Sequence, residues 1–296
     1  MKKMHGNLLL LTAAFIWGFG FITQTVAMDH IGPLTFNAVK YLIGGVTLLF
    51  VIPVLDRFKS PGEMKNNDNA VTVKGGIACG AVLAVASAFQ QFGIMQTTVG
   101  KAGFITALYV VIVPLLAVVI GKKIRPLIWL CVIMSAAGLY FLSMKDSLRL
   151  SHGDLMVFLC AVSFAVHILV IDHFIPYTDG ARLSCIQFFT AGLISLVPAL
   201  IREHPVFTDL AAAVLPLLYS GVFSSGAGYT LQIIGQKNAD PAIASMILSL
   251  ESVFAAIDGF VFLHQSVSLR ELFGMVLMFA AIILSQLPEK STAAEM

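Results

Sequence analysis

The sequence predicts an all-α membrane protein in which ten transmembrane helices form two inverted five-helix repeats. The first observation is composition, since 58% of the 296 residues are hydrophobic and 11% are charged, whereas soluble domains carry about 25% charged residues. The second is a series of long apolar segments separated by short polar connections. The third is a set of short motifs from the first half of the chain that recur in the second half.

Ten apolar segments are long enough to cross a hydrocarbon core about 30 Å thick as helices. They cover residues 7–28, 34–55, 74–96, 99–120, 125–143, 153–172, 181–201, 211–234, 241–262 and 269–287. Helices are predicted because only helices and closed barrels satisfy all backbone hydrogen bonds in lipid, and these segments are too long and too continuously apolar for barrel strands. The longest connection, residues 56–73, is rich in Asn and Lys and is predicted to be a solvated loop.

The first segment is predicted to remain in the protein as a membrane span. Lys2 and Lys3 precede it as in a signal peptide, but the apolar run continues to Met28 and no small-residue cleavage site is evident. Of the 18 Lys and Arg residues, twelve fall on the side of the N-terminus, five fall on the opposite side, and Lys40 lies within a span. Because cytoplasmic connections carry an excess of positive residues, both termini are predicted to be cytoplasmic.

The internal repeat divides the chain at residue 146, into units 1–146 and 147–296. Gly6-Asn7-Leu8 recurs as Gly153-Asp154-Leu155 at an offset of 147, and Gln91 corresponds to Gln232 at an offset of 141. Residues 107–111 correspond to residues 249–253 at an offset of 142. A unit with an odd number of spans must enter the membrane from the opposite side in its second copy, which predicts an inverted repeat with a site at the membrane midplane.

Glu251 is the strongest candidate for a functional residue. At about 1.5 Å per residue from Pro241, it lies roughly 15 Å deep, close to the midplane of the membrane. An ionisable group at that depth usually faces a cavity or a partner. Two interpretations stay open: a site for a substrate amine or a proton, and a structural hydrogen bond to a neighbouring helix.

Four other ionisable residues lie in or near the spans. His167 is deep enough for a proton relay, although a packed structural histidine is the more ordinary explanation. Lys40 lies about 10 Å from Pro33, so it either reaches the outer headgroups or pairs with Asp258 or an anionic substrate. Asp258 and Asp172 are expected near the outer surface and the cytoplasmic loop, respectively, where water solvates them.

Polar amides and aromatic residues complete the set of candidates. Gln91 and Gln232, with Gln90 beside them, place amides at equivalent depths if the repeat is correct, where they bind polar ligands or bridge helices. Aromatic side chains in the spans are candidates to line an apolar pocket or to pack against lipid and neighbouring helices. They are Trp17, Phe89, Tyr109 and Tyr229.

Several classes of function lack support in the sequence. The four cysteines all lie in apolar segments without metal-ligand spacing, so neither a disulfide framework nor a metal site is predicted. The sequence contains none of the common hydrolase, zinc-protease or nucleotide-binding motifs. We therefore expect a protein that is not an enzyme, needs no cofactor and binds no nucleic acid.

The motifs resemble those of the EamA-type transporters of the drug/metabolite transporter superfamily. Residues 102–109 (AGFITALY), followed by Pro114-Leu115, look like the fourth span of that family. Ser249-Leu250-Glu251 and residues 253–256 look like its ninth span. Leu231-Gln232 and Gln236-Lys237 in span eight, Trp17-Gly18 in span one and residues 172–174 also fit. The family usually has Pro where this chain has Ser252, and an acidic residue after Gly where it has His264-Gln265.

The resemblance implies a secondary active transporter that works by alternating access in a bacterial-type inner membrane. Such proteins often export amino acids, other metabolites or drugs, from a cavity lined by spans one, three, four, six, eight and nine. We expect Glu251, Gln91, Gln232, Tyr109 and Trp17 to bind substrate, and Glu251 and His167 are the candidates for proton coupling. An uncoupled facilitator or channel, a non-transporting membrane partner or sensor, and a homodimeric assembly remain open.

Overall fold

A computed structural model describes residues 2–57, 68–97, 99–143, 151–262 and 267–287. Within these residues, every regular element is a helix. The helices are α1 (Lys2–Met28), α2 (Pro33–Asp56), α4 (Asn69–Ile94), α5 (Val99–Ala107), α6 (Tyr109–Val119), α7 (Pro126–Ser143), α8 (His152–Phe174), η1 (Ile175–Tyr177), α9 (Gly180–Arg202), α10 (Phe207–Ala212), α11 (Val214–Leu218), η2 (Tyr219–Tyr229), α12 (Thr230–Gln236), α13 (Pro241–Leu248), α14 (Glu251–Phe262) and α15 (Leu269–Ser285).

Six helical stretches in the described chain are long and apolar enough to cross a membrane. They correspond to the predicted spans one, two, three, four, six and seven. The other predicted spans are shorter or interrupted: α7 and α15 have 18 and 17 residues, and the span at 211–234 is divided among α11, η2 and α12. The all-helical membrane fold is therefore found, with six clear spans and several shorter helices.

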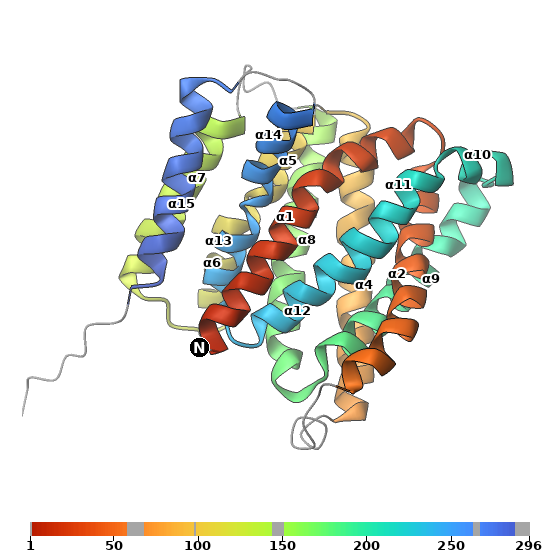
Figure 1. The fold of residues 1–296 in the computed structure, drawn as a ribbon, viewed down its shortest axis with the longest axis horizontal. Helices are drawn as coiled ribbons and strands as arrows, with labels where there is room; N and C mark the ends of the chain where they lie inside the picture. The colour runs from red at the N-terminus through yellow and green to blue at the C-terminus, as the bar shows by residue number, and fades with distance from the viewer. Residues whose placement is uncertain (1, 58–67, 98, 144–150, 263–266, 288–296) are drawn as a thin grey trace, which may run out of the picture.

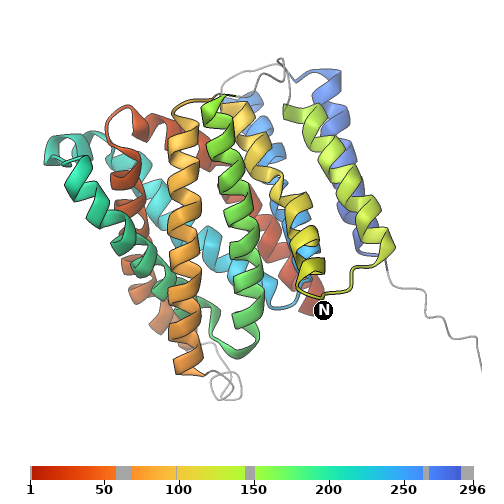
Figure 2. The same ribbon diagram turned by 180° about the vertical axis from the view of Figure 1, so that it is seen from behind.

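The helices pack side by side in a bundle whose elements pair across the sequence. In Figure 1, α7 and α15 lie together at the left, α2 and α9 at the right, and α1 and the η2–α12 segment run obliquely across the front. Figure 2 shows α4 and α8 on the opposite face. These pairings place residues from both halves of the chain around one central region.

Side-chain caps fix the starts of several helices. Asp68 accepts hydrogen bonds from the backbone N–H groups of Ala70 and Val71, so α4 begins at Asn69 and not at residue 74 as predicted. The predicted solvated loop is shorter for this reason, and its residues 58–67 lie outside the described residues. Ser151 and Ser268 form capping boxes at the starts of α8 and α15.

The surface is apolar and the interior contains polar groups, which is the arrangement expected in lipid. Phe50, Val119 and Leu215 are at least 75% exposed. Gln91 and His167 are fully buried. All four cysteines are also buried and free.

Glycines allow close contact between α4 and α9. A Cβ atom on Gly76 would lie 2.6 Å from Ile186 Cβ, and one on Gly80 would lie 2.6 Å from the carbonyl oxygen of Gln187. These distances are too short for any side chain. The glycines of α4 therefore serve close helix packing.

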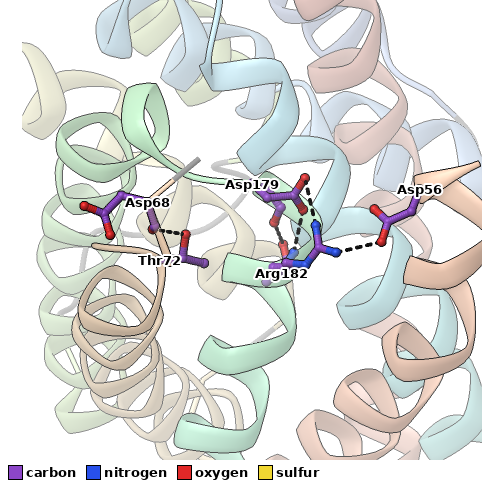
Figure 3. A network of polar contacts seen from close by, with 7 residues as sticks. Asp56, Asp68, Thr72, Asp179 and Arg182 are labelled. Carbon is purple, nitrogen blue, oxygen red and sulfur yellow. Dashed lines mark hydrogen bonds and ion pairs between the residues drawn. The ribbon is translucent and has the colours of Figure 1, made fainter. Parts of the chain in front are cut away.

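Polar contacts gather at the end of the bundle where α1 begins and α15 ends. Asn7 Nδ2 donates to Gln286 Oε1 at 2.8 Å, which brings the two ends of the described chain together. Nearby elements are joined by Arg182 of α9, whose guanidinium lies 2.7 Å from Asp56 of α2 and 3.8 Å from Asp179 (Figure 3). Lys122 forms an ion pair with Asp172 at the end of α8.

Candidate functional site

A small cavity of about 50 Å³ lies among helices from both halves of the chain. Its walls combine aromatic, amide, hydroxyl and charged side chains. The lining residues are Trp17, Phe21, Gln24, Lys40, Gln90, Thr106, Tyr109, Phe164, Ile168, Ser224, Tyr229, Gln232, Leu248 and Glu251. A cavity needs about 10–15 Å³ to hold a single water. The walls must therefore separate before anything much larger than a few waters can enter.

Two interrupted helices meet at this cavity. The first break lies at Leu108, between α5 and α6, and the second at Ser249-Leu250, between α13 and α14. At both breaks a backbone N–H bonds to the carbonyl oxygen three residues earlier, instead of four as in an α-helix. Leu108 N–H donates to Ile105 O, and Leu250 N–H donates to Ile247 O, both at 3.2 Å. Pro114 lies inside α6 and does not end it.

Each break positions the side chain that follows it. Tyr109 is the first residue of α6 and Glu251 is the first residue of α14. Tyr109 Oη donates a hydrogen bond to Glu251 Oε1 at 3.1 Å, and both side chains are buried. The carboxyl group of Glu251 thus faces the cavity with one neutral donor from the other half of the chain.

Trp17 and Tyr229 form an aromatic wall. The Trp17 indole Nε1 donates to the carbonyl oxygen of Ser224 at 3.1 Å, and its ring lies 4.7 Å from that of Tyr229. Ser224 and Tyr229 belong to η2, an 11-residue π-helix that contains three glycines. One of them, Gly228, lies so close to Trp17 that a Cβ atom there would be 2.5 Å from the indole nitrogen. The π-helix therefore lets the indole lie against its backbone.

The predicted amides separate into two groups. Gln232 and Gln90 line the cavity. Gln232 Nε2 donates to Gln236 Oε1 at 3.0 Å, and its Oε1 has no hydrogen-bond partner among the described residues. Gln91 is not among the lining residues of the described chain. Its Nε2 donates instead to Gln24 Oε1, so it positions a lining side chain.

His167 lies behind the cavity wall. Its ring is fully buried, and Nε2 lies 3.1 Å from Gln187 Oε1. The ring contacts the edges of Phe164 and Tyr229, at centroid distances of 6.5 and 6.0 Å. It is absent from the lining residues that the described structure gives for the cavity, so the rings of Phe164 and Tyr229 separate it from the cavity.

The remaining ionisable candidates are dispersed. Lys40 is 6% exposed and lines the cavity, so its side chain does not reach the headgroup region. Asp172 is paired with Lys122 and is not simply solvated. Asp258 belongs to α14, but its side chain lies outside the described residues, as do His264 and Gln265. In the described chain, no cluster of His, Cys, Asp and Glu could hold a metal ion.

Sequence reasoning missed three polar residues in the cavity wall: Gln24, Thr106 and Ser224. Gln24 and Thr106 are single polar residues within apolar segments, and this pattern could have marked them as candidates to face a polar cavity. Ser224 lies in the stretch SGVFSSGAGY, whose dense glycines were a sign of irregular helix geometry.

An all-helical bundle with an apolar surface, interrupted helices and an internal polar cavity is characteristic of a multi-pass membrane transport protein. The comparisons agree. The chain belongs to the EamA-like transporter family, which matches residues 4–144 and again residues 151–287. The resemblance inferred from the sequence motifs is thereby confirmed.

Among relatives, an uncharacterized transporter of Archaeoglobus fulgidus is 28% identical over 97% of this chain and 87% of that protein. The uncharacterized transporter YwfM of Bacillus subtilis is 27% identical over 100% of this chain and 98% of its own length. A solved structure described as "Crystal structure of protein" has a TM-score of 0.75 at 17% identity and covers 95% of this chain and 96% of its own. That likeness supports the fold alone.

Proposed function

We propose that this protein is a secondary active exporter that moves small metabolites or drugs through the central cavity by alternating access. The observation that carries the proposal is the Tyr109–Glu251 hydrogen bond, which joins the two interrupted helices at the cavity. Interrupted helices near the midplane are the usual binding elements of transporters with inverted repeats. A buried carboxyl group there can bind a cationic group or exchange a proton.

The packing of helices supports two inverted five-helix repeats. In the proposed repeat, α2 of the first half corresponds to α9 of the second, and α7 corresponds to α15. Each of these helices packs against its own counterpart. The contact of α4 with α8 maps onto that of the α11–α12 segment with α1, and both are present. The two breaks also correspond, because Tyr109 and Glu251 are separated by the repeat offset of 142.

Alternating access can be tested with a cysteine in the cavity wall. Ser224→Cys introduces a thiol in a protein whose four native cysteines are buried. A membrane-impermeant thiol reagent should modify it in both right-side-out and inside-out vesicles, with a bound substrate slowing the reaction. Modification from one side alone contradicts alternating access and favours a sensor or partner.

Coupling can be tested in proteoliposomes with labelled alanine, leucine and ethidium. An imposed pH gradient should drive accumulation of at least one of them above equilibrium. Flux that only equilibrates favours an uncoupled facilitator or channel.

The proposed membrane orientation predicts that the impermeant reagent, added to intact cells, labels Asp29→Cys and spares Lys3→Cys. The opposite pattern would place the termini outside.

A further inference from the structure

Lys40 is a buried cation in the same cavity as Glu251. It lies about two turns from the start of α2, is 6% exposed, and is the one lysine among the lining residues that the described structure gives. Its Nζ lies 4.7 Å from the centroid of the Phe36 ring and 4.9 Å from that of Tyr41. The ammonium group is therefore held by aromatic rings from its own helix.

These rings do not neutralise the charge. Within the described chain, no carboxylate oxygen lies within 4.0 Å of Lys40 Nζ, and no hydrogen bond involves it. A ring face attracts a cation, but less strongly than the desolvation of an ammonium group opposes its burial. Buried charges are normally paired, so an anion that enters the cavity can pair with Lys40.

Glu251 presents the complementary charge and is likewise not paired with Lys40. Its one described partner is the neutral hydroxyl of Tyr109. The two side chains line one cavity, but the Lys40 nitrogen does not lie within 4.0 Å of a Glu251 carboxylate oxygen, so they form no ion pair. The wall therefore offers a cation-binding group and an anion-binding group at separate places.

We infer that Lys40 binds the anionic group of the transported substrate, and that this substrate is a small zwitterion whose amine contacts Glu251. This inference rests on the proposed transport function and adds to it the substrate class and a binding residue. A substrate with one charge would leave either Lys40 or Glu251 buried without a counter-charge, whereas a zwitterion satisfies both. Trp17 and Tyr229, which also line the cavity, can pack against an apolar side chain of the substrate.

Ligands that differ only in their charged groups test the roles of Lys40 and Glu251 separately. Alanine, serine, leucine and phenylalanine are tested alongside their amides, which are cations, their N-acetyl derivatives, which are anions, and their N-acetyl amides, which are neutral. Purified full-length protein in detergent is melted with each compound, because a ligand that binds the folded state raises the midpoint. At least one free amino acid should stabilise the protein, with about tenfold or greater preference over its three derivatives.

Variants then exchange the charge preference. Lys40→Met should weaken binding of the free amino acid by about tenfold or more. The amide should then bind this variant as tightly as the amino acid, or more tightly. Glu251→Gln should instead favour the N-acetyl derivative, and Lys40→Arg should retain the zwitterion. A reversal of preference cannot come from misfolding, and the melting midpoint without ligand checks that each variant folds.

Three results would overturn the inference: no free amino acid stabilises the protein, an amide binds the wild type as well as its amino acid, or Lys40→Met keeps the zwitterion preference. These results are distinguishable from failure of the transport proposal. A cationic amine that is transported through Glu251 while Lys40→Met has no effect would leave alternating access intact and remove the zwitterion. Loss of two-sided access at Ser224→Cys would count against transport itself.

Discussion

The pair formed by Tyr109 and Glu251 is the most informative residue-level feature. If the halves are repeats, these residues occupy equivalent positions, yet one is a phenol and the other a carboxylic acid. Two carboxylates meeting across the cavity would repel each other, whereas a hydroxyl donor and a carboxylate acceptor form a hydrogen bond. The difference at this one position therefore allows a hydrogen bond between the two halves and leaves a single carboxyl group, that of Glu251, among the described residues that line the cavity.

The pH dependence of transport should follow Glu251. Glu251→Gln keeps the shape of the side chain but cannot exchange a proton, so transport should lose its pH dependence between pH 5 and 9. Tyr109→Phe should keep that dependence and weaken substrate affinity by about tenfold, since a hydrogen bond to a charged group contributes about 1.5–3 kcal/mol. Initial rates of flux in proteoliposomes at a series of pH values measure both effects.

His167→Gln is the matched control for this experiment. His167 lies behind Phe164 and Tyr229, so its replacement should leave the pH profile in place. If the profile disappears in His167→Gln and survives in Glu251→Gln, the proton passes through the histidine and the assignment to Glu251 is wrong.

Gly228 should be needed to hold the Trp17 indole against η2. A methyl group at Gly228 would lie 2.5 Å from Trp17 Nε1, so Gly228→Ala should displace the ring and break its hydrogen bond to Ser224 O. We expect a decrease in substrate affinity of about fivefold or more, corresponding to the loss of about 1 kcal/mol. Ligand titration followed by tryptophan fluorescence would detect both the displacement and the weaker binding.

Gly103→Ala is the appropriate comparison, because the nearest side-chain atom, on Phe21, would be 4.0 Å from the added Cβ. This variant should bind substrate like the wild type. Equal binding by both glycine variants would show that the position of the indole is unimportant.

At the level of elements, α7 and α15 form a pair that is separate from the cavity. Gly138 and Gly274 face each other, and a Cβ atom on Gly274 would lie 2.5 Å from the carbonyl oxygen of Gly138. Among the described residues, none from these two helices lines the cavity. Their packing therefore contributes to stability and can be changed without touching the site. The resemblance likewise implied a cavity lined by spans other than five and ten.

Gly274→Ala should destabilise the protein without altering ligand selectivity. Because the methyl group would meet backbone atoms, the helices must move apart, at a cost of about 1–3 kcal/mol. We expect a lower thermal midpoint in detergent and an unchanged order of ligand affinities. Val276→Ala on the same helix, at a residue that is 59% exposed, should change stability by about 0.5 kcal/mol or less. A stable Gly274→Ala variant would refute the close packing.

At the scale of the whole molecule, hydropathy predicted the membrane fold well because backbone hydrogen bonding in lipid leaves few alternatives. The depth of Glu251 could be counted along one helix, so its burial was predictable. The places of Gln91 and Lys40 were harder to predict, because they depend on how helices rotate toward one another. A rotation of one residue, about 100° for a helix with 3.6 residues per turn, moves a side chain from the cavity to a neighbouring helix.

The proposed inverted arrangement predicts that ion pairs between the halves act as a gate at one end of the cavity. Lys122 pairs with Asp172, and Arg182 pairs with Asp56 (Figure 3), so each pair joins a residue before position 146 to one after it. Asp56→Asn combined with Asp172→Asn should open that end more often. Partly exposed pairs contribute up to about 1 kcal/mol each, which corresponds to about a fivefold shift per pair. The rate of modification of Ser224→Cys should rise by up to about fivefold for each neutralised pair from this end and fall from the other.

Asp29→Asn is the control, because Asp29 is exposed in the connection between α1 and α2 at the opposite end of the bundle. The charge-exchanged variant Lys122→Asp with Asp172→Lys should return the labelling rates toward those of the wild type, since the attraction is restored with reversed signs. Raising the salt concentration should reduce the difference between the wild type and the neutralised variant, because ions screen exposed pairs. If neutralisation speeds modification from both ends equally, the pairs stabilise the whole bundle, and the gate must be formed by other contacts.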